Sequence, residues 1–557
     1  RIEDVSTLDV MSPEIDPGVY ARRWWTLAVL CLSLLIVFVG NSSLNVTIPT
    51  LSRVLGATTA QLQWVIAAYS LVFAGLLFST GALGDRYGRK GALQLGLIIY
   101  LVACVLATMS DAMWQLIACR AVMGVGAALI MPSTLSILVN VFPPEERTKA
   151  IAIWAGVTGG AGAIGQVATG LLLGHFWYGS VFFVNVPILV AALVAGWFLV
   201  PKSRDPEQGK LDPVGAVLSI VGISSLVYGL IQAPQIGWLA PETLLAFVIS
   251  AVVLTVFVLW ELRVDEPMLD MRYFRNPAFS TGTGGMILVF LSMFGVMFLI
   301  TQYFQLILGY SPLGAAVRFL PMAPIMAVVA PLTPRLSARF GANRVVAAGM
   351  TGVALGFVMF RSLGPHTSYW YVLACIVPMV SGMALSMSPM TASIMSAVPP
   401  RRAGAGSAMN DATRELGAAL GIALMGSVAA SAYSSSLAGV LRGLPETVKH
   451  QARTSLADAL AAGARLGGPV GQALISGAQH AFIDGIVLAV TAGAALAAIA
   501  AVLVYRTLPR EAAHGTALES PIAALEATAE LFAGVEPAFA SEREFGESEH
   551  LAAGAGE

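Results

Sequence analysis

Long apolar runs are the feature that most restricts what this chain can fold into. A helix of about 20 apolar residues crosses the roughly 30 Å core of a bilayer, and runs of this length recur along most of the sequence. Hydrophobic residues make up 57% of the chain and charged residues only 11%, against roughly a quarter charged in soluble domains. Because so few charged residues cannot cover the surface of a protein in water, the solvent of this chain must be lipid. In lipid, only helices and closed barrels pair every backbone group.

Fourteen apolar runs are long enough to cross a bilayer, which predicts an all-α integral membrane protein. Six lie in the N-terminal half, two in the middle and six in the C-terminal half. The predicted spans are 26–48, 61–82, 91–110, 114–138, 149–172, 178–200, 212–233, 241–261, 279–303, 315–336, 343–362, 369–396, 408–432 and 483–506. An even number of spans places both termini on the same side of the membrane.

Basic residues gather in the short loops on one side of these spans, and the positive-inside rule makes that side cytoplasmic. We therefore expect a multi-pass protein of the cytoplasmic membrane with both termini in the cytoplasm. Residues 1–25 would form an N-terminal tail, and 433–482 would form a long external loop. The segment 507–557 is rich in glutamate, which predicts a disordered cytoplasmic tail.

Short segments of the first six spans recur in the last six. The matched pairs are Pro143-Pro144 with Pro399-Pro400, Gly81–Lys90 with Pro334–Asn343, and Phe183-Val184-Asn185 with Phe482-Ile483-Asp484. Two six-helix bundles in the same orientation, at 26–200 and 279–506, with two inserted helices at 212–261, account for these matches. Parallel repeats of this kind hold a substrate at the midplane and expose it alternately to each side. The architecture is that of a transporter.

A loop motif rich in glycine and charge joins the second and third spans. It runs Gly81-Ala82-Leu83-Gly84-Asp85-Arg86-Tyr87-Gly88-Arg89-Lys90. Glycines allow a sharp turn at the membrane surface, and Asp85 can interact with a nearby helix N-terminus. The motif resembles the signature loop of the major facilitator superfamily, although a basic inner loop that only obeys the charge rule is the alternative. The residues assigned to gating in this interpretation are Gly81, Asp85, Arg86, Gly88, Arg89 and, in the thirteenth span, Arg414.

Further motifs are similar to one branch of that superfamily, the fourteen-helix drug:proton antiporters. They are Gln63-Trp64, Leu116-x-x-x-Arg120-x-x-x-Gly124-x-Gly126, Pro234-Gln235-Ile236-Gly237-Trp238 and Asn410-Asp411-Ala412-Thr413-Arg414-Glu415-Leu416-Gly417. The resemblance extends from residue 25 to residue 508. It implies proton-coupled export of hydrophobic or amphiphilic drugs or toxic compounds by alternating access. An exporter of a lipid, a siderophore or a secondary metabolite with the same fold is the alternative.

Two positions depart from the pattern of that branch. In the first span, Gly40 stands where the family pattern has an aspartate. In the fifth span, Gln166 replaces a proline and Thr169 replaces a glycine, whereas Gly165 and Gly170 are kept. Glycines on a transmembrane helix allow a neighbouring helix to pack closely. The missing carboxylate at position 40 puts the usual coupling site of the family in doubt.

Ionisable residues inside a membrane are candidates for function because burying a charge there costs at least about 2.5–3.5 kcal/mol. Arg120 of the fourth span is expected to face the same cavity as Asn41 of the first span. It would then take part in substrate binding or proton coupling, or it would only hydrogen-bond to Asn41 and to backbone carbonyls.

A second charged group begins the thirteenth span. Asp411 and Glu415 lie four residues apart on one helical face, and Arg414 can pair with Asp411. Two compatible roles remain open for this group. It can latch to Asp85 and Arg89 when the cytoplasmic side is closed, or Glu415 and Asp411 can carry protons.

Amide side chains are candidates for a polar lining of the substrate site, with packing between helices as the alternative. They are Asn41, Asn45, Gln166 and Gln302. No Ser/His/Asp set, metal-ligand cluster or Walker A motif supports an enzyme, and no cofactor or metal is expected. The net charge of −1 excludes a nucleic-acid binder. The expected partners are a small amphiphilic substrate, protons and the bilayer, and the expected state is a monomer.

Overall fold

The computed structural model describes residues 17–203, 212–265, 267–398 and 403–510, and among these residues it contains helices and no strand. Some side chains within the described helices, including that of Asp85, are also left undescribed. Nearly all of the predicted C-terminal tail lies outside the described residues.

The helices follow one another through two halves of the chain. The first half contains α1 (Pro17–Ala21), α2 (Arg23–Leu55), α3 (Thr59–Tyr87), α4 (Arg89–Thr108), α5 (Met113–Val141), α6 (Pro144–His175), α7 (Ser180–Phe183) and α8 (Asn185–Leu199). Two helices stand between the halves, α9 (Pro213–Ile236) and α10 (Pro241–Glu261). The second half begins with the short helix η1 (Met271–Arg275), continues with α11 (Pro277–Gln302) and the π-helix η2 (Tyr303–Ile307), and then contains α12 (Pro312–Phe319), α13 (Met322–Val329), α14 (Leu332–Phe340), α15 (Ala342–Phe360), α16 (Tyr369–Ser396), α17 (Ala403–Val440), α18 (Glu446–Thr454), α19 (Leu456–Leu466) and α20 (Gly468–Thr507).

Among the described residues, 13 helical segments are long and apolar enough to cross a membrane. They coincide with thirteen of the fourteen predicted spans. The remaining predicted span, 149–172, lies within α6, which is a continuous helix of 32 residues. The prediction of an all-helical membrane protein is therefore confirmed.

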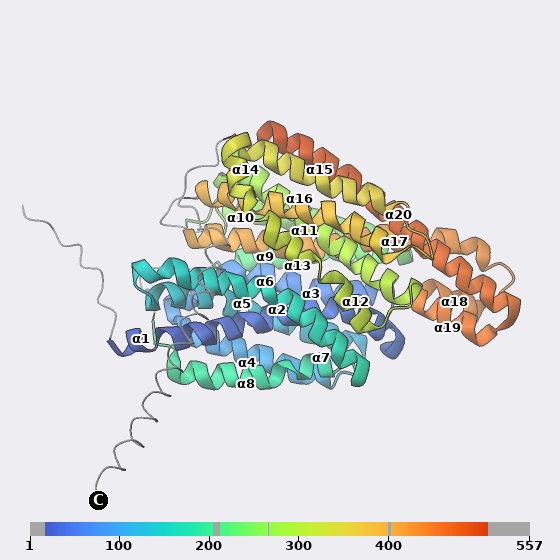
Figure 1. The fold of residues 1–557 in the computed structure, drawn as a ribbon, viewed down its shortest axis with the longest axis horizontal. Helices are drawn as coiled ribbons and strands as arrows, with labels where there is room; N and C mark the ends of the chain where they lie inside the picture. The colour runs from blue at the N-terminus through green and yellow to red at the C-terminus, as the bar shows by residue number, and fades with distance from the viewer. Residues whose placement is uncertain (1–16, 204–211, 266, 399–402, 511–557) are drawn as a thin grey trace, which may run out of the picture.

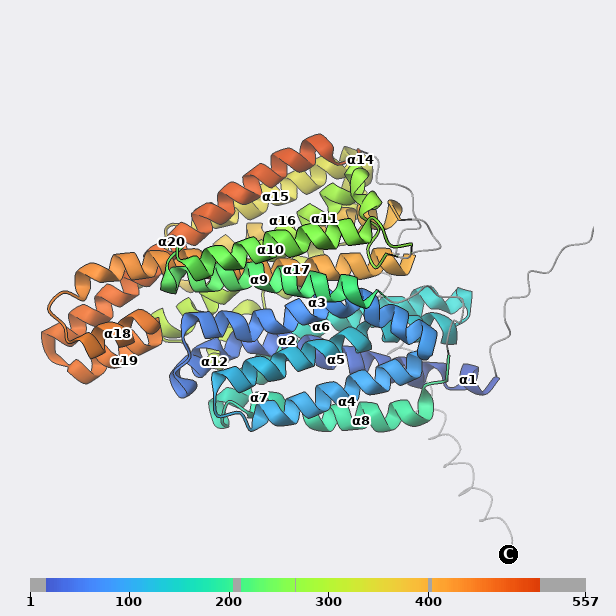
Figure 2. The same ribbon diagram turned by 180° about the vertical axis from the view of Figure 1, so that it is seen from behind.

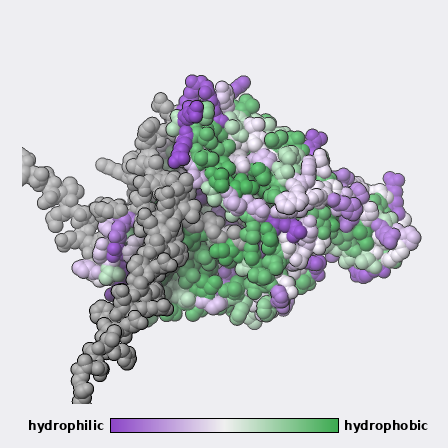
Figure 3. All heavy atoms as spheres, in the orientation of Figure 1, coloured by the Kyte–Doolittle hydropathy of each residue, from purple (hydrophilic) through white to green (hydrophobic). Residues whose placement is uncertain are grey.

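The long helices run side by side along one axis (Figure 1). Helices α2 to α8 form one bundle and α11 to α20 form the other, and α9 packs against both α3 and α17 at the seam between them (Figure 2). We call the end where α2 begins and α20 finishes the terminal end, and the opposite end, where α18 and α19 project, the hairpin end. Hydrophobic residues gather over the middle of the visible face, and hydrophilic residues gather at the tip formed by α18 and α19 (Figure 3).

The predicted span 315–336 is not one straight helix. It is divided into α12, α13 and α14, with breaks at Pro321 and Pro331. Proline has no N–H to donate and its ring clashes with the preceding turn, so it interrupts a helix. The apolar pattern located this membrane segment, but the prolines determine its shape.

The segment 433–482, which we predicted as a long loop, is mostly helical. Helix α17 continues to Val440, α18 and α19 form a hairpin, and α20 already begins at Gly468. Ser455 caps α19 by accepting a hydrogen bond from the backbone N–H of Asp458 (3.1 Å). This segment is therefore a structured projection.

Helices α4 and α5 approach each other closely because glycines face each other at their crossing. A Cβ atom built on Gly126 would lie 2.8 Å from the carbonyl oxygen of Gly96 and 3.0 Å from the Cβ of Tyr100. Since the backbone itself is the obstacle, no side-chain rotation can relieve such a contact.

We therefore expect Gly126→Ala to destabilise the purified protein, because overpacking of a tight interface costs about 1–3 kcal/mol. Gly91→Ala, on the other helix of this pair, α4, is the control, since a Cβ atom there meets nothing within 4 Å. Thermal unfolding in detergent measures both variants. Equal unfolding temperatures for Gly126→Ala and Gly91→Ala would show that the crossing is looser than described.

Candidate functional site

Arg120 is the largest fully buried side chain among the described residues. From α5 its Nε donates a hydrogen bond to the carbonyl oxygen of Val65 (3.2 Å), and its Nη1 donates to that of Gly40 (3.4 Å). Its Nη2 donates to Oδ1 of Asn41 (3.5 Å). The ring centroid of Tyr69 lies 4.3 Å from the guanidinium carbon. The expected contact with Asn41 is present, and all of these partners are electrically neutral.

The glycines of the Arg120 motif bring two tyrosines to this cation. A Cβ atom on Gly124 would lie 2.7 Å from the carbonyl oxygen of Tyr69, so α3 can pass close to α5 only at a glycine. Gly126 gives α4 the same close approach at Tyr100. Arg120 and the two glycines therefore act as one packing unit, in which the glycines position the rings of Tyr69 and Tyr100.

Tyr100 occupies the space that a side chain at position 40 would need. A Cβ atom built on Gly40 would overlap the hydroxyl of Tyr100. Tyr100 and Tyr69 are both fully buried, and neither hydroxyl has a hydrogen-bond partner among the described residues. The position where the family pattern has an aspartate is thus filled from α4 by a neutral hydroxyl group.

The close contact between Gly40 and the Tyr100 hydroxyl predicts that substitutions at these two positions have non-additive effects on stability. Gly40→Ala alone should destabilise the protein by about 1–3 kcal/mol, because its methyl group meets the buried Tyr100 hydroxyl. Tyr100→Phe removes that oxygen, so the double variant should recover most of the loss. A double-mutant cycle on thermal unfolding measures the coupling between the two positions. Additive effects would contradict the overlap.

The second charged group lies on α17, in the other half. Arg414 Nη1 is 3.8 Å from Asp411 Oδ1, so these residues form the ion pair that their spacing allows. Their side chains are 30% and 18% exposed, respectively. Glu415 is half-buried, and its Oε2 atom has no hydrogen-bond partner among the described residues.

Glu415 interacts with polar and charged groups of both halves. These groups are Ser70 of α3 and Arg120 of α5, together with Asp411 and Arg414 on its own helix. A carboxyl group from one bundle is therefore within electrostatic range of a permanent cation from the other. This arrangement can hold or release a proton at a place where the halves meet.

The hydrogen bonds that join the halves within the described residues all lie toward the hairpin end. Gln63 Nε2 donates to the carbonyl oxygens of Ile422 (3.0 Å) and Ala423 (3.3 Å). Gln305 Nε2 donates to that of Val46 (3.0 Å). The remaining bonds are Gln63 Nε2 to Ser427 Oγ (3.4 Å), Ser52 Oγ to Ser455 Oγ (3.3 Å) and Thr59 Oγ1 to the carbonyl oxygen of Thr454 (3.4 Å). The two halves are thus fastened to each other at the hairpin end.

Glycines of α6 take part in packing within and between the halves. A Cβ atom on Gly165 would lie 3.0 Å from Cα of Val39 on α2. One on Gly170 would lie 2.7 Å from Cα of Leu313 on α12, in the other half. The close packing expected from the retained glycines is therefore present.

The loop motif at 81–90 forms a tight connection at the terminal end. Gly88 has φ of +124°, a conformation that favours glycine, and it separates α3 from α4. The backbone N–H of Arg89 donates to the carbonyl oxygen of Ser203 (3.0 Å). Arg86 is exposed, and a Cβ atom on Gly81 would lie 3.6 Å from Pro132.

The latch that we expected between α17 and this loop involves Asp85. Its side chain lies outside the description, so the latch stays a prediction.

The predicted amides are distributed along the interior. Asn45 is buried on α2, and its Oδ1 atom has no partner among the described residues. Gln166 is half-buried on α6, next to the crossing with α2. Gln302 donates to the carbonyl oxygen of Phe298 on its own helix (3.2 Å). Asn41, Asn45 and Gln166 therefore belong to the N-terminal half, whereas Gln302 belongs to the C-terminal half.

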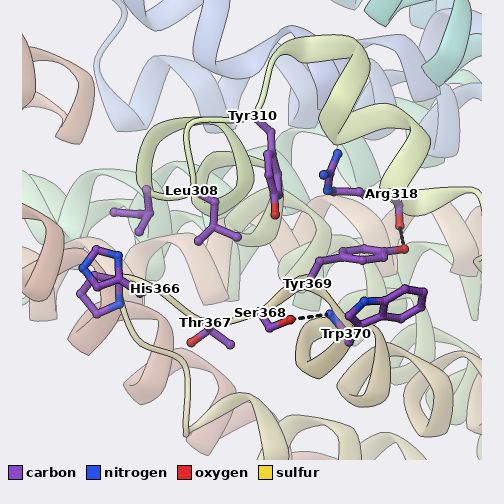
Figure 4. A pocket seen from close by; sticks show the side chains of 10 residues that line it. Leu308, Tyr310, Arg318, His366, Thr367, Ser368, Tyr369 and Trp370 are labelled. Carbon is purple, nitrogen blue, oxygen red and sulfur yellow. Dashed lines mark hydrogen bonds between the residues drawn. The ribbon is translucent and has the colours of Figure 1, made fainter.

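A separate cavity of about 640 Å³ opens near the hairpin end of the C-terminal half. Arg318 lies over the ring of Tyr310 (3.5 Å to its centroid), and the hydroxyl of Tyr369 donates to the carbonyl oxygen of Arg318 (3.0 Å) (Figure 4). His366 and Trp370 are among the other residues that line the cavity. None of the predicted site residues lines this cavity.

Within the described part of the chain, no three His, Cys, Asp or Glu residues are grouped so that they could hold a metal ion. The site therefore consists of an arginine, carboxyl groups, amides and hydroxyls. Such a set can bind protons and polar groups of a small molecule.

Residues 30–422 match the family model of the Major Facilitator Superfamily. The multidrug efflux pump LfrA of Mycolicibacterium smegmatis is 34% identical over 87% of this chain and 96% of its own length. The tetracenomycin C resistance and export protein of Streptomyces glaucescens is 31% identical over 91% and 96%. The methyl viologen resistance protein SmvA of Salmonella typhimurium is 33% identical over 83% and 93%.

The fold is also similar to solved transporter structures. A bacterial homologue of the human lysosomal transporter Spinster, in an inward-facing and unoccupied conformation, superposes with a TM-score of 0.61. It shares 18% identity over 87% of this chain and 98% of that one. The many apolar helices and the similarity to transporters together define a multi-pass membrane transporter. This chain belongs to the Major Facilitator Superfamily.

Sequence reasoning did not find Ser70, Tyr69 and Tyr100 as parts of the site. They lie on α3 and α4. Tyr69 stands near the Gln63-Trp64 motif that resembles the antiporter branch, but neither it nor Ser70 or Tyr100 was assigned to the site, because local sequence does not tell which helical face meets Arg120. The glycines at 124 and 126 were the available signal, because each one marks where a neighbouring helix passes closest to Arg120.

Proposed function

We propose that this protein is a proton-coupled antiporter that exports hydrophobic or amphiphilic compounds across the cytoplasmic membrane by alternating access. The observation that carries the proposal is the unpartnered carboxyl oxygen of Glu415 on α17, which is within electrostatic range of the buried cation of Arg120 from the other half. Relatives named for multidrug efflux and for drug resistance support the substrate class. A monomer within the bilayer is sufficient for this mechanism.

In this proposal the chain crosses the membrane fourteen times, because α6 also spans the bilayer in addition to the 13 apolar helical segments. Both termini are cytoplasmic because basic residues such as Arg22 and Arg23 lie at the terminal end. The hairpin end is then external, and the hydrogen bonds made there by Gln63 and Gln305 close the external side. The described state is accordingly inward-facing.

Transport then follows from the charge state of Glu415. In the inward-facing state Glu415 releases its proton to the cytoplasm, and substrate enters beside Asn41, Asn45, Gln166 and Gln302. After the halves rock, substrate leaves outward and Glu415 takes a proton from outside. The charge change biases the two conformations because each of them surrounds Glu415 with different groups. Asp411 is a second proton carrier, and Arg120 and Arg414 supply the opposing charges.

Glu415→Gln should abolish proton-driven efflux, because glutamine keeps the shape of the side chain but cannot release a proton. Substrate exchange without a proton gradient should persist. Everted vesicles that contain a pH-sensitive dye measure the first activity, and counterflow of labelled substrate measures the second. Asp484→Asn is the matched control and should behave as wild type, because the carboxyl group of Asp484 is exposed on α20. Wild-type proton coupling in Glu415→Gln would move the coupling site elsewhere.

Asp85→Asn tests the gating motif. We expect it to lower the maximal transport rate at least tenfold while the protein still inserts and binds substrate, because the proposed latch at the terminal end forms only in the outward-facing state. Transport kinetics and equilibrium binding on the same preparation separate the two effects. A wild-type transport rate would remove Asp85 from the gate.

A further inference from the structure

We propose that the site between α2 and α17 selects uncharged amphiphiles that carry a hydrogen-bond acceptor, and that it discriminates against dications. This inference rests on the proposed transport function and names the substrate class of the same site. Its basis is the sum of charges around Arg120 and the way in which Arg120 orients Asn41.

While Asp411 is ionised, the charges at the site add up to zero or +1, depending on the protonation state of Glu415, and protonation of Asp411 makes the sum more positive. Arginine keeps its proton in proteins, so Arg120 always contributes +1. Asp411 and Arg414 form an ion pair and cancel each other. Glu415 contributes −1 or, when protonated, zero. A site with this balance never offers the excess negative charge that a dication needs, and an unpaired charge buried in a membrane is costly.

No acid on α2 changes this balance. Position 40 is a glycine, and the space beside it is filled by the neutral hydroxyl of Tyr100. Tyr69, whose ring lies near the guanidinium group of Arg120, adds a second neutral hydroxyl. In the N-terminal half, the described residues that contact the Arg120 side chain therefore supply dipoles and a sulfur atom but no negative charge.

Asn41 determines which polar group of a substrate fits. A guanidinium group has only donors, so the amide of Asn41 must turn its oxygen toward Arg120. The NH₂ group of Asn41 is then directed away from Arg120, and among the described residues no acceptor is bonded to it. Asn41 is half-buried whereas Arg120 is fully buried, so Asn41 is the residue that meets the substrate. It presents donors, which bind a carbonyl, ether or other acceptor.

Arg120 is thus a positioning residue for Asn41, and Glu415 faces the bound molecule from the other half. A neutral substrate leaves the electrostatic attraction between Glu415 and Arg120 undisturbed. Among the described residues of this site, Glu415 is the carboxylate that is not already in an ion pair. A dication would compete with Arg120 for it and would leave positive charge without compensation. Selection against dications follows from this competition.

The experiment compares three probes on the purified full chain in proteoliposomes: chloramphenicol (uncharged), tetraphenylphosphonium (one positive charge) and methyl viologen (two). Equilibrium binding and proton movement are both measured. We expect chloramphenicol to bind and to move protons, with methyl viologen at least tenfold weaker in both measurements. Asn41→Asp, which has nearly the same shape, replaces the donors with a negative charge. It should weaken chloramphenicol binding at least tenfold and strengthen that of tetraphenylphosphonium.

Asn140→Asp, the same chemical change at an exposed position of α5, is the control and should leave the order of the probes unchanged. If methyl viologen binds wild type as tightly as chloramphenicol, the inference is overturned while the transport function stands. An unaltered order of probes in Asn41→Asp would also overturn it. If no probe binds or moves protons, the proposed function fails and the inference fails with it. The wild-type comparison decides the question even if Asn41→Asp does not fold.

Discussion

A guanidinium group that cannot lose its proton, held in the interior by neutral partners, is the constraint on which the rest of this site depends. Arg120 donates hydrogen bonds to two backbone carbonyls and to the oxygen of Asn41, and its guanidinium carbon lies near the ring of Tyr69. A charge placed in a membrane costs at least about 2.5–3.5 kcal/mol, so these contacts must persist for the helix to stay inserted. The glycines of α5 are needed for the same reason, since they bring α3 and α4 near enough to supply the rings.

The fixed cation of Arg120 in the N-terminal half determines the charge that Glu415 of the C-terminal half faces. Glu415 comes from α17 and is within electrostatic range of Arg120 only as long as the two bundles meet in the described way. At the hairpin end, Gln63 and Gln305 join the bundles through side chain to backbone hydrogen bonds. Such bonds are individually weak, with a net contribution of about 0.5–1.5 kcal/mol each. They can therefore hold one state without preventing the movement that alternating access needs.

Much of this arrangement could be predicted from the sequence, because a segment that crosses lipid must be helical, apolar and about 20 residues long. Apolar length located the spans, and helical spacing predicted the ion pair between Asp411 and Arg414. The contact between Arg120 and Asn41 followed from their similar depth in neighbouring helices. The sequence did not reveal that Tyr100 fills the space beside Gly40, because periodicity does not tell which faces of α2 and α4 meet. The helical hairpin of α18 and α19 was missed because a segment too polar for the membrane gives no comparable signal.

Proton release on substrate binding tests the central claim most directly. The purified chain in weakly buffered detergent is mixed with a transported compound, and an indicator dye reports the pH. The account predicts that wild type releases a proton as substrate binds, and that Glu415→Gln binds the compound and releases none. Equal proton release from Glu415→Gln, or binding to wild type without any release, would contradict the account.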